Sequence, residues 1–229
     1  MNPSPALRSE LDGLVANIEL TLASIVQGLA LSFLAEGAGK VFSEAKFSAW
    51  PYVAVALVII LLFWSRALIH TLTLIRWPLE FVHNFFYFGC ALVEVLAFMH
   101  LHDPLQWFVW NTLFAALVWA LFLHDLRIIR ARSADSIGPS GGRLYAAVEA
   151  DQWLNIRFIM PGAFLFNLGC VLAIRSAPSF FLNRQGHLLL IGCQGIGLLV
   201  YLVHVVRAFV KMIPLISATR AEWQDDELK

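Results

Sequence analysis

The stretch PLEFVHNFFYFGCALVEVLAFMHLH, residues Pro78–His102, is long and apolar enough to cross a lipid bilayer. About 20 helical residues, at roughly 1.5 Å each, span roughly 30 Å of hydrocarbon. With helical spacing, its polar and small residues recur at intervals of three, four and seven and share one face: Glu80, His83, Asn84, Tyr87, Cys90, Ala91, Glu94 and His102. The stretch therefore predicts a membrane-spanning helix with one polar side.

Glu94 lies near the middle of this span. A carboxylate at that depth costs several kcal/mol unless it faces protein, water or a partner, or keeps its proton. A lipid-facing position is therefore excluded, and we expect Glu94 to be a central titrating or cation-binding group. The alternative is a structural carboxyl that holds the bundle together through hydrogen bonds to amides of other spans: Asn111, Asn167 or Gln194.

The rest of the chain has the composition of an integral membrane protein. Its 229 residues are 59% hydrophobic and only 14% charged, and the mean hydropathy is +0.73. The formal net charge is zero, so the total gives no indication of nucleic-acid binding. The three cysteines, Cys90, Cys170 and Cys193, sit in apolar segments without metal-ligand spacing and are predicted to be small core residues.

The hydropathy pattern predicts an all-α membrane protein with six transmembrane helices arranged as three hairpins. The predicted spans are residues 13–35, 51–75, 79–101, 104–124, 153–174 and 187–210. The turn from His100 to Pro104 separates the third and fourth spans. Pro161 and Gly162 predict a break or kink in the fifth.

The predicted organisation has five parts. Residues 1–12 form a cytoplasmic N-terminus without a cleavable signal, 13–124 hold the first four spans, 153–212 hold the last two, and 213–229 form a cytoplasmic tail. Residues 125–152 are predicted to be a basic, Gly/Ser-containing cytoplasmic loop. This loop includes a short interfacial helix from Arg143 to Asp151.

The basic residues predict the orientation of the chain in the membrane. With the N-terminus in the cytoplasm, twelve Lys and Arg residues lie on or towards that side: Arg8, Arg66, Arg76, Arg127, Arg130, Arg132, Arg143, Arg157, Arg207, Lys211, Arg220 and Lys229. The other side holds four: Lys40, Lys46, Arg175 and Arg184. This asymmetry predicts that both termini are cytoplasmic, in a membrane of the bacterial inner type.

A ladder of polar groups along the third span suggests movement of an ion, a proton or a small solute. Glu80 and Glu94 are 14 residues apart, about 21 Å of helix, with His83, Asn84 and Tyr87 between them. Glu80 and His83 would form the cytoplasmic entrance. The opposing wall would come from the sixth span, through Gln194, Tyr201 and His204.

The first span adds Glu19 and Gln27 to the predicted site. Its polar arc is broad, so this helix is expected to be surrounded by protein. Glu19 lies about one turn inside the membrane boundary, where Arg66 or His70 on the second span is the expected partner in an interfacial ion pair. Ser24 and Gly28 form a small-xxx-small pair suited to close helix packing.

Other functions remain open at this stage. No phosphate loop, nucleophile elbow, HExxH or paired-Asp motif is present, so no enzyme activity, metal or cofactor is predicted, although an intramembrane hydrolase needs no local motif. One alternative is a scaffold, sensor or effector that contacts a cytoplasmic protein through Arg127–Arg143. Another is a b-type haem protein using histidines near the two membrane faces: His70, His83 and His204, or His100, His102 and His187. The small size favours a homo-oligomer.

Overall fold

The computed structural model describes residues 5–73, 81–134 and 138–227, and these contain helices and no strand. The long helices are α1 (Pro5–Ser43), α2 (Trp50–Thr73), α3 (Phe81–Phe98), α4 (Pro104–Ala134), α5 (Gly138–Leu154), α6 (Met160–Ser176) and α7 (His187–Glu227). Three short helical segments complete the chain: η1 (Phe47–Ala49), η2 (Asn155–Ile159) and η3 (Ser179–Asn183).

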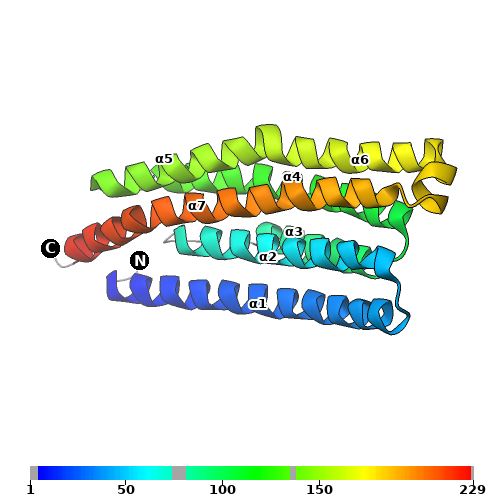
Figure 1. Ribbon diagram of the computed structural model, residues 1–229. Coiled ribbons are helices and arrows are strands. Elements are labelled where there is room, and N and C mark those ends of the chain that lie inside the picture. Colours follow the sequence, from blue (N-terminus) through cyan, green and yellow to red (C-terminus); the bar gives the residue numbers. More distant parts are fainter. Residues whose placement is uncertain (1–4, 74–80, 135–137, 228–229) are drawn as a thin grey trace.

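The prediction of six spans in an all-α membrane protein is confirmed. Six described helical segments are long and apolar enough to cross a membrane: Gly13–Ser43, Phe47–Thr73, Phe81–Phe98, Pro104–Ala134, Gly138–Ser176 and His187–Glu222. Their axes are roughly aligned, so that they form one elongated bundle (Figure 1). Both chain ends lie at the same end of this bundle. We call this the termini end, and the opposite one the loop end.

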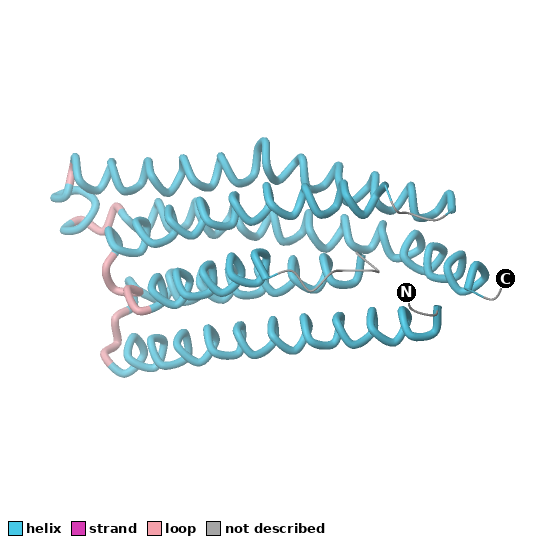
Figure 2. Tube along the Cα trace, turned by 180° about the vertical axis from the view of Figure 1, so that it is seen from behind, coloured by secondary structure: helices cyan, strands magenta, loops and turns pink. Residues whose placement is uncertain are grey.

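The packing partners arrange the helices in a ring. α1 packs against α2 and α3, α3 packs against α4, and α4 packs against both α5 and α6. On the other side, α7 packs against α2 and α5. The order around the bundle is therefore α1, α2, α7, then α5 and α6, then α4 and α3. Figure 2 shows the same elongated bundle from behind, with the described loops, in pink, at the loop end.

The last two spans are neighbours in sequence, but their main packing partners are other helices. α6 lies mostly along α4, whereas α7 lies mostly along α2 and α5. The link through η3 between them ends at the loop end (Figure 1). This divergence leaves the α6–α7 side of the ring less closely packed than the other sides.

The turn between the third and fourth spans contains the residues that were expected to end one helix and begin the next. α3 ends at Phe98, and α4 begins at Pro104, whose missing N–H is no loss at a helix start. Asp103 caps α4, because its Oδ1 accepts a hydrogen bond from the backbone N–H of Gln106 at 3.1 Å.

The segment 125–152, predicted to be a loop, is mostly helical in the structure. α4 continues to Ala134, and α5 begins at Gly138 and runs through η2 into α6; residues 135–137 lie outside the described part. The predicted short helix from Arg143 to Asp151 is the middle of α5. Arg130 Nε donates to Glu149 Oε1 at 2.8 Å, which joins α4 to α5. Charged residues lower hydropathy without ending a helix, so hydropathy alone placed the end of one helix too early and the start of the next too late.

The fifth span has a change of helix type where a break or kink was predicted. η2 is a π-helical turn that ends two residues before Pro161, and the helix continues through it. Pro161 has no N–H to donate to the carbonyl four residues earlier, and a wider turn accommodates this missing bond.

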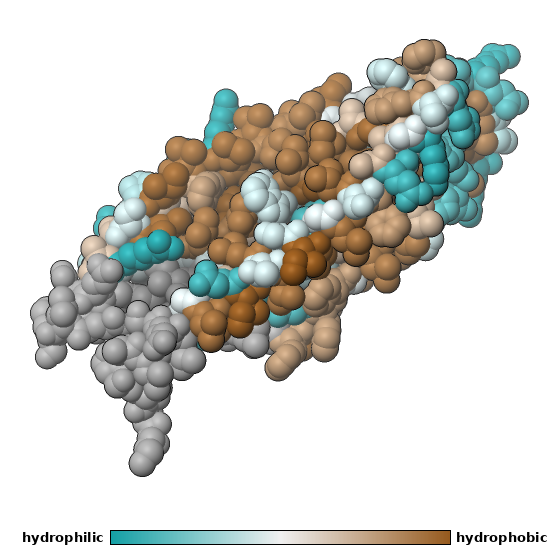
Figure 3. Space-filling model, turned by 90° about the horizontal axis from the view of Figure 1, so that it is seen from below, coloured by the Kyte–Doolittle hydropathy of each residue, from teal (hydrophilic) through white to brown (hydrophobic). Residues whose placement is uncertain are grey.

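Within the single chain, the first span is not surrounded by protein. An exposed band of small and polar side chains runs along its outer face: Asn17, Thr21, Ser24, Gly28 and Ser32. Figure 3 views this side and shows a pale band crossing a mostly hydrophobic surface, with hydrophilic residues gathered at the loop end. The broad polar arc of α1 is therefore divided between this outer band and the buried Glu19 and Gln27.

Candidate functional site

A cavity of about 410 Å³ lies inside the ring, bordered by α2, α3, α4, η2, α6 and α7. Ligand pockets in proteins commonly measure roughly 300–1,000 Å³. The middle of its wall is apolar: Leu62, Phe63, Phe114, Val118 and Leu121. Polar side chains occupy its two ends. A cavity with polar ends and an apolar middle suits an amphipathic or partly hydrated small molecule.

At the termini end, two histidines face one aspartate. Asp125 of α4 is 1% exposed, and its Oδ1 lies 2.7 Å from His83 Nδ1 of α3. Its Oδ2 lies 3.7 Å from Nδ1 of His70, which comes from α2. All three residues border the cavity. Three helices thus place two imidazoles and a carboxylate where a proton can be held or exchanged.

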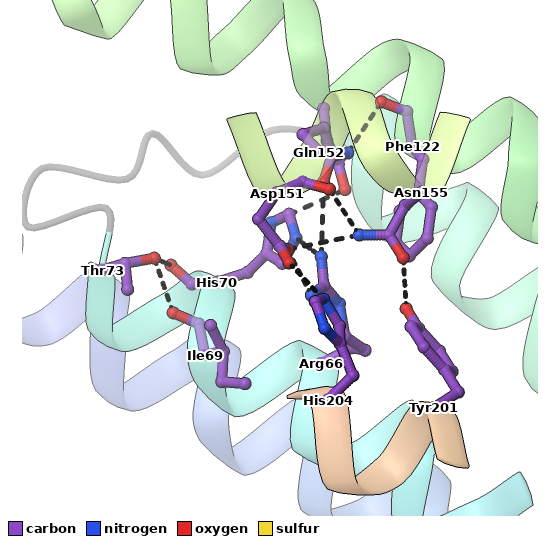
Figure 4. Close-up of polar contacts among 11 residues, drawn as sticks. Arg66, Ile69, His70, Thr73, Phe122, Asp151, Gln152, Asn155, Tyr201 and His204 are labelled. Carbon is purple, nitrogen blue, oxygen red and sulfur yellow. Dashed lines mark hydrogen bonds and ion pairs between the residues drawn. The ribbon is translucent and has the colours of Figure 1, made fainter. Parts of the chain in front are cut away.

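A second polar network stands beside this cluster and is centred on Arg66 (Figure 4). Arg66 Nη1 donates to Asp151 Oδ2 at 2.6 Å, and its Nη2 donates to Gln152 Oε1 at 3.4 Å. The guanidinium also lies over the ring of Phe122, 5.2 Å from the centroid. Arg66 is 6% exposed, so its charge is balanced by a buried partner, as an intramembrane charge requires.

The same network continues from Asp151 to α7. Asn155 donates from Nδ2 to Asp151 Oδ2 at 3.2 Å, and its Oδ1 accepts from the Tyr201 hydroxyl at 2.5 Å. His204 Nε2 lies 3.5 Å from Asp151 Oδ1. Figure 4 shows these side chains converging from α2, the α5–η2 segment and α7. Tyr201 and Arg66 border the cavity, whereas His204 does not.

At the opposite end of the cavity, neutral amides replace the charged groups. Gln194 of α7 accepts from Trp107 Nε1 of α4 at 2.9 Å, and its Nε2 donates to Asn167 Oδ1 of α6 at 3.1 Å. Its Nε2 also lies 3.5 Å from Asn111 Oδ1. This amide cluster ties three helices together without any charge.

A second, much smaller cavity of about 20 Å³ lies against the first. The two share Ala67, His70, His83 and Tyr87. Glu19 and Asn84 also border the small one, and Asn84 Nδ2 donates to Glu19 Oε1 at 3.0 Å. A volume above roughly 10–15 Å³ holds one water. Glu19 is therefore one water-sized space away from the histidines.

Glu94 occupies a different environment from the one expected of a central transport group. It is 1% exposed and borders neither cavity. Gln27 Nε2 of α1 donates to its Oε2 at 3.3 Å, and Oε1 has no hydrogen-bond partner among the described residues. The amides that were considered as its partners, Asn111, Asn167 and Gln194, bind one another instead.

The predicted polar face of the third span is therefore divided among different partners. His83 and Tyr87 border the main cavity, Asn84 pairs with Glu19, and Glu94 pairs with Gln27. Glu80 lies outside the described residues. The expected ion pair of Glu19 with Arg66 is absent from the described contacts, because Asn84 bonds to Glu19 and Asp151 bonds to Arg66. Pairing of Glu19 with His70, the other expected partner, stays a prediction, and both residues border the small cavity.

Sequence reasoning missed Asp125, Asp151 and Asn155. Asp125 comes one residue after the predicted end of the fourth span, and Asp151 comes two residues before the predicted start of the fifth. Both were placed in a cytoplasmic loop because the two predicted spans stop short of them, although the helices continue past both. A pair of acidic residues at the edges of two neighbouring apolar runs, with Arg66 inside a third, was the available signal.

The described residues contain no group of three or more His, Cys, Asp or Glu side chains arranged to hold a metal ion. His70 and His83, two of the histidines considered for haem, both point Nδ1 at the same carboxylate of Asp125. The polar contacts of these residues are hydrogen bonds and ion pairs.

No protein-family model, curated protein or solved structure matches this chain.

Proposed function

We propose that this membrane protein moves a small solute through the central cavity, with proton exchange at His70, His83 and Asp125. The single observation that carries the proposal is the cavity of about 410 Å³ with this cluster on its wall. A membrane-embedded space of ligand size, with a titratable group at one end, is what a proton-coupled carrier needs.

The contacts favour this route over the polar side of α3. A continuous path along α3 would need water or partners from His83 to Glu94, but Glu94 is enclosed beside Gln27 and borders no described cavity. The cavity instead extends from the histidines to the amide cluster at Gln194. The proposed path therefore runs between α4 and α7, and Glu94 serves the packing of α1 on α3.

A proton can reach the cluster from the termini end. Glu19 and Asn84 border the small cavity, which shares His70 and His83 with the main one. One water there would connect the Glu19 carboxylate to the imidazoles, and the imidazoles already face Asp125. Arg66 and Asp151 compensate each other beside this path, so their charges set the local field without adding net charge.

Proton movement in reconstituted vesicles tests the proposal. Purified protein is placed in vesicles containing a trapped pH-sensitive dye, and a potassium gradient with valinomycin supplies the driving potential. The dye signal is recorded first without added solute. It is recorded again after adding hexanol, hexyl sulfate or hexyltrimethylammonium, none of which carries a titrating proton. We expect at least one condition to give a rate about tenfold above protein-free vesicles, because a positioned acid and base accelerate proton transfer.

Three variants locate the route. Asp125→Asn should reduce the rate to the protein-free level, and His83→Gln repeats the test if that variant does not fold. Glu94→Gln is the matched control, being a buried carboxyl off the cavity, and should keep the wild-type rate. Loss of the proton-movement rate in Glu94→Gln alone would indicate that protons move along the polar face of α3 instead. No response in any condition would instead favour a scaffold, sensor or effector.

Orientation and assembly belong to the same proposal. We take the termini end as cytoplasmic, in a bacterial inner membrane, on the distribution of Lys and Arg. We also propose a homo-oligomer in which the exposed band of α1 from Asn17 to Ser32 meets a second copy, because small residues let helices approach closely in lipid. The scaffold, sensor or effector alternative predicts that Arg127–Arg143 contacts a cytoplasmic protein.

A further inference from the structure

The main cavity opens sideways through the wall between α6 and α7. Four residues both border the cavity and are exposed at the surface of the molecule: Phe158 and Gly162 on one side, and Cys193 and Gly197 on the other. Residues of α2, α3 and α4 on the cavity wall are buried or half-buried. The opening is therefore confined to one side of the ring.

The sequence explains why this side is open. α6 follows α4 and α7 follows α2, so the two last spans diverge. At Gly162 and Gly197 an added Cβ would meet nothing within 4 Å, so the missing side chains leave space at the gap. Larger side chains at these two positions would narrow the opening without a backbone clash.

The opening lies at the depth of the acyl chains. Gly197 is ten residues into α7, which begins at His187 at the loop end, so it sits about 15 Å along the helix. The hydrocarbon core of a bilayer is roughly 30 Å thick. The mouth is therefore near the bilayer middle, where the solvent is lipid rather than water. Leu165 and Ile196, on the same two helices, are 64% and 66% exposed, as expected for lipid-facing positions.

The wall inside the mouth carries a hydrogen-bond donor that lacks an acceptor. Arg66 borders the cavity and is 6% exposed, and its Nε finds no hydrogen-bond partner among the described residues. A buried donor without an acceptor destabilises the folded protein, and a bound acceptor would remove that cost. The apolar middle of the cavity lies between this donor and the amide cluster.

We infer that the cavity binds a single-chain amphiphile dissolved in the bilayer, which enters between α6 and α7 and presents a carboxylate or carbonyl oxygen to Arg66. The chain would occupy the apolar middle beside Phe63, Phe114 and Leu121. This inference rests on the proposed function for the claim that the molecule is moved. Binding itself is measured separately, so the two claims can fail separately.

Photo-crosslinking tests where the amphiphile binds. The full chain is reconstituted in phosphatidylcholine vesicles with palmitate that carries a diazirine on its chain, irradiated, digested and mapped by mass spectrometry. We expect adducts on inward-facing residues such as Phe63, Phe114 and Leu121. An excess of unlabelled palmitate should reduce these adducts, whereas butyrate, which has the same head and almost no chain, should not.

Glycine variants test the mouth, each with a matched control on the same helix. Gly197→Leu and Gly162→Leu should lower the inward adducts several-fold, because the new side chains narrow the opening. Gly192→Leu and Gly169→Leu are the controls: both glycines are exposed, have no atom within 4 Å of an added Cβ and do not border the cavity. These controls should keep the wild-type yield. Thermal unfolding in detergent confirms that all four variants fold.

The possible results separate the two claims. Adducts confined to outward residues such as Leu165 and Ile196, with equal yield in every variant, would overturn the inference. Inward adducts that disappear in the mouth variants would support it, even if the vesicle experiment detects no movement. Proton or solute movement without inward adducts would keep the proposed function and reject this class of ligand.

Discussion

Glu94 and Asp125 are both buried acidic side chains in the membrane region, each 1% exposed, yet their surroundings differ. Glu94 sits between α1 and α3, with one hydrogen bond from Gln27, and borders no described cavity. Asp125 sits where α2, α3 and α4 meet, faces two histidines and lies on the wall of the main cavity. Burial in a membrane helix therefore does not identify a transport group. The proposed role of Asp125 rests instead on its partners and on its access to the cavity.

The difference has a physical basis in how each site compensates charge. The cavity side combines Asp125 and Asp151 with Arg66 and two histidines, so acidic and basic groups can balance. On the α1–α3 side, the hydrogen-bond partner of Glu94 is the neutral amide of Gln27. An unbalanced charge is costly in a medium of low dielectric constant. The cavity side can avoid this cost, because a change of protonation there can occur by moving a proton between neighbouring groups.

The largest effect on stability should come from breaking the ion pair on the cavity side. Arg66→Met leaves the Asp151 carboxylate, 2.6 Å from the guanidinium in the structure, without its counter-charge. We expect a loss of about 3–5 kcal/mol in the free energy of unfolding, because a buried charge loses its partner. Thermal and denaturant unfolding in detergent micelles would measure it.

The double variant Arg66→Met with Asp151→Leu is the control for this prediction. It removes both charges at once, and replacing a whole buried ion pair by apolar residues is often neutral or stabilising. Most of the lost stability should return. A double variant as unstable as Arg66→Met alone would show that the loss comes from packing around Phe122 and Gln152, and not from the unpaired charge.

Gln27→Leu should give an intermediate effect on the α1–α3 side. The substitution removes the hydrogen bond to Glu94 Oε2, and Glu94 Oε1 already has no partner among the described residues. An enclosed polar group without a partner costs about 1–3 kcal/mol. Unfolding in micelles should show this loss, while proton movement in vesicles should be unchanged. A change in the vesicle rate with unchanged stability would place Gln27 on the route.

The six candidate spans were accessible from sequence because hydropathy and helix length depend on local composition. The spans and the turn at Asp103 follow from long apolar runs and from capping chemistry. The partners of the polar residues were not accessible in the same way. Periodicity places His83, Asn84 and Glu94 on one side of a helix, but the neighbouring helix at each height decides the contact. The contacts place Asp125 beside His83, Glu19 beside Asn84, and Gln27 beside Glu94.

The second feature that the sequence did not predict correctly was the position of the helix ends. Hydropathy falls where charged residues appear, so Asp125 and Asp151 were assigned to a loop although the helices continue past both. Their burial depends on partners from distant parts of the sequence: His70 and His83 for one, Arg66 for the other. A charge that is compensated after folding looks the same in sequence as a charge that stays in water.

Glu94→Gln should have the smallest effect of these changes, within about 1 kcal/mol on unfolding and with no change in proton movement. The glutamine keeps the size of the side chain and an oxygen that can accept from Gln27 Nε2, and its amide adds a donor beside Gln27 Oε1, which has no partner among the described residues. It also removes any cost of holding a charge in this enclosed place. If Glu94 only joins α1 to α3, the amide does so equally well. A drop of several kcal/mol, or loss of the vesicle rate in a variant that unfolds like the wild type, would show that the carboxyl proton itself matters. That result would make Glu94 functionally equivalent to Asp125 in spite of their different surroundings.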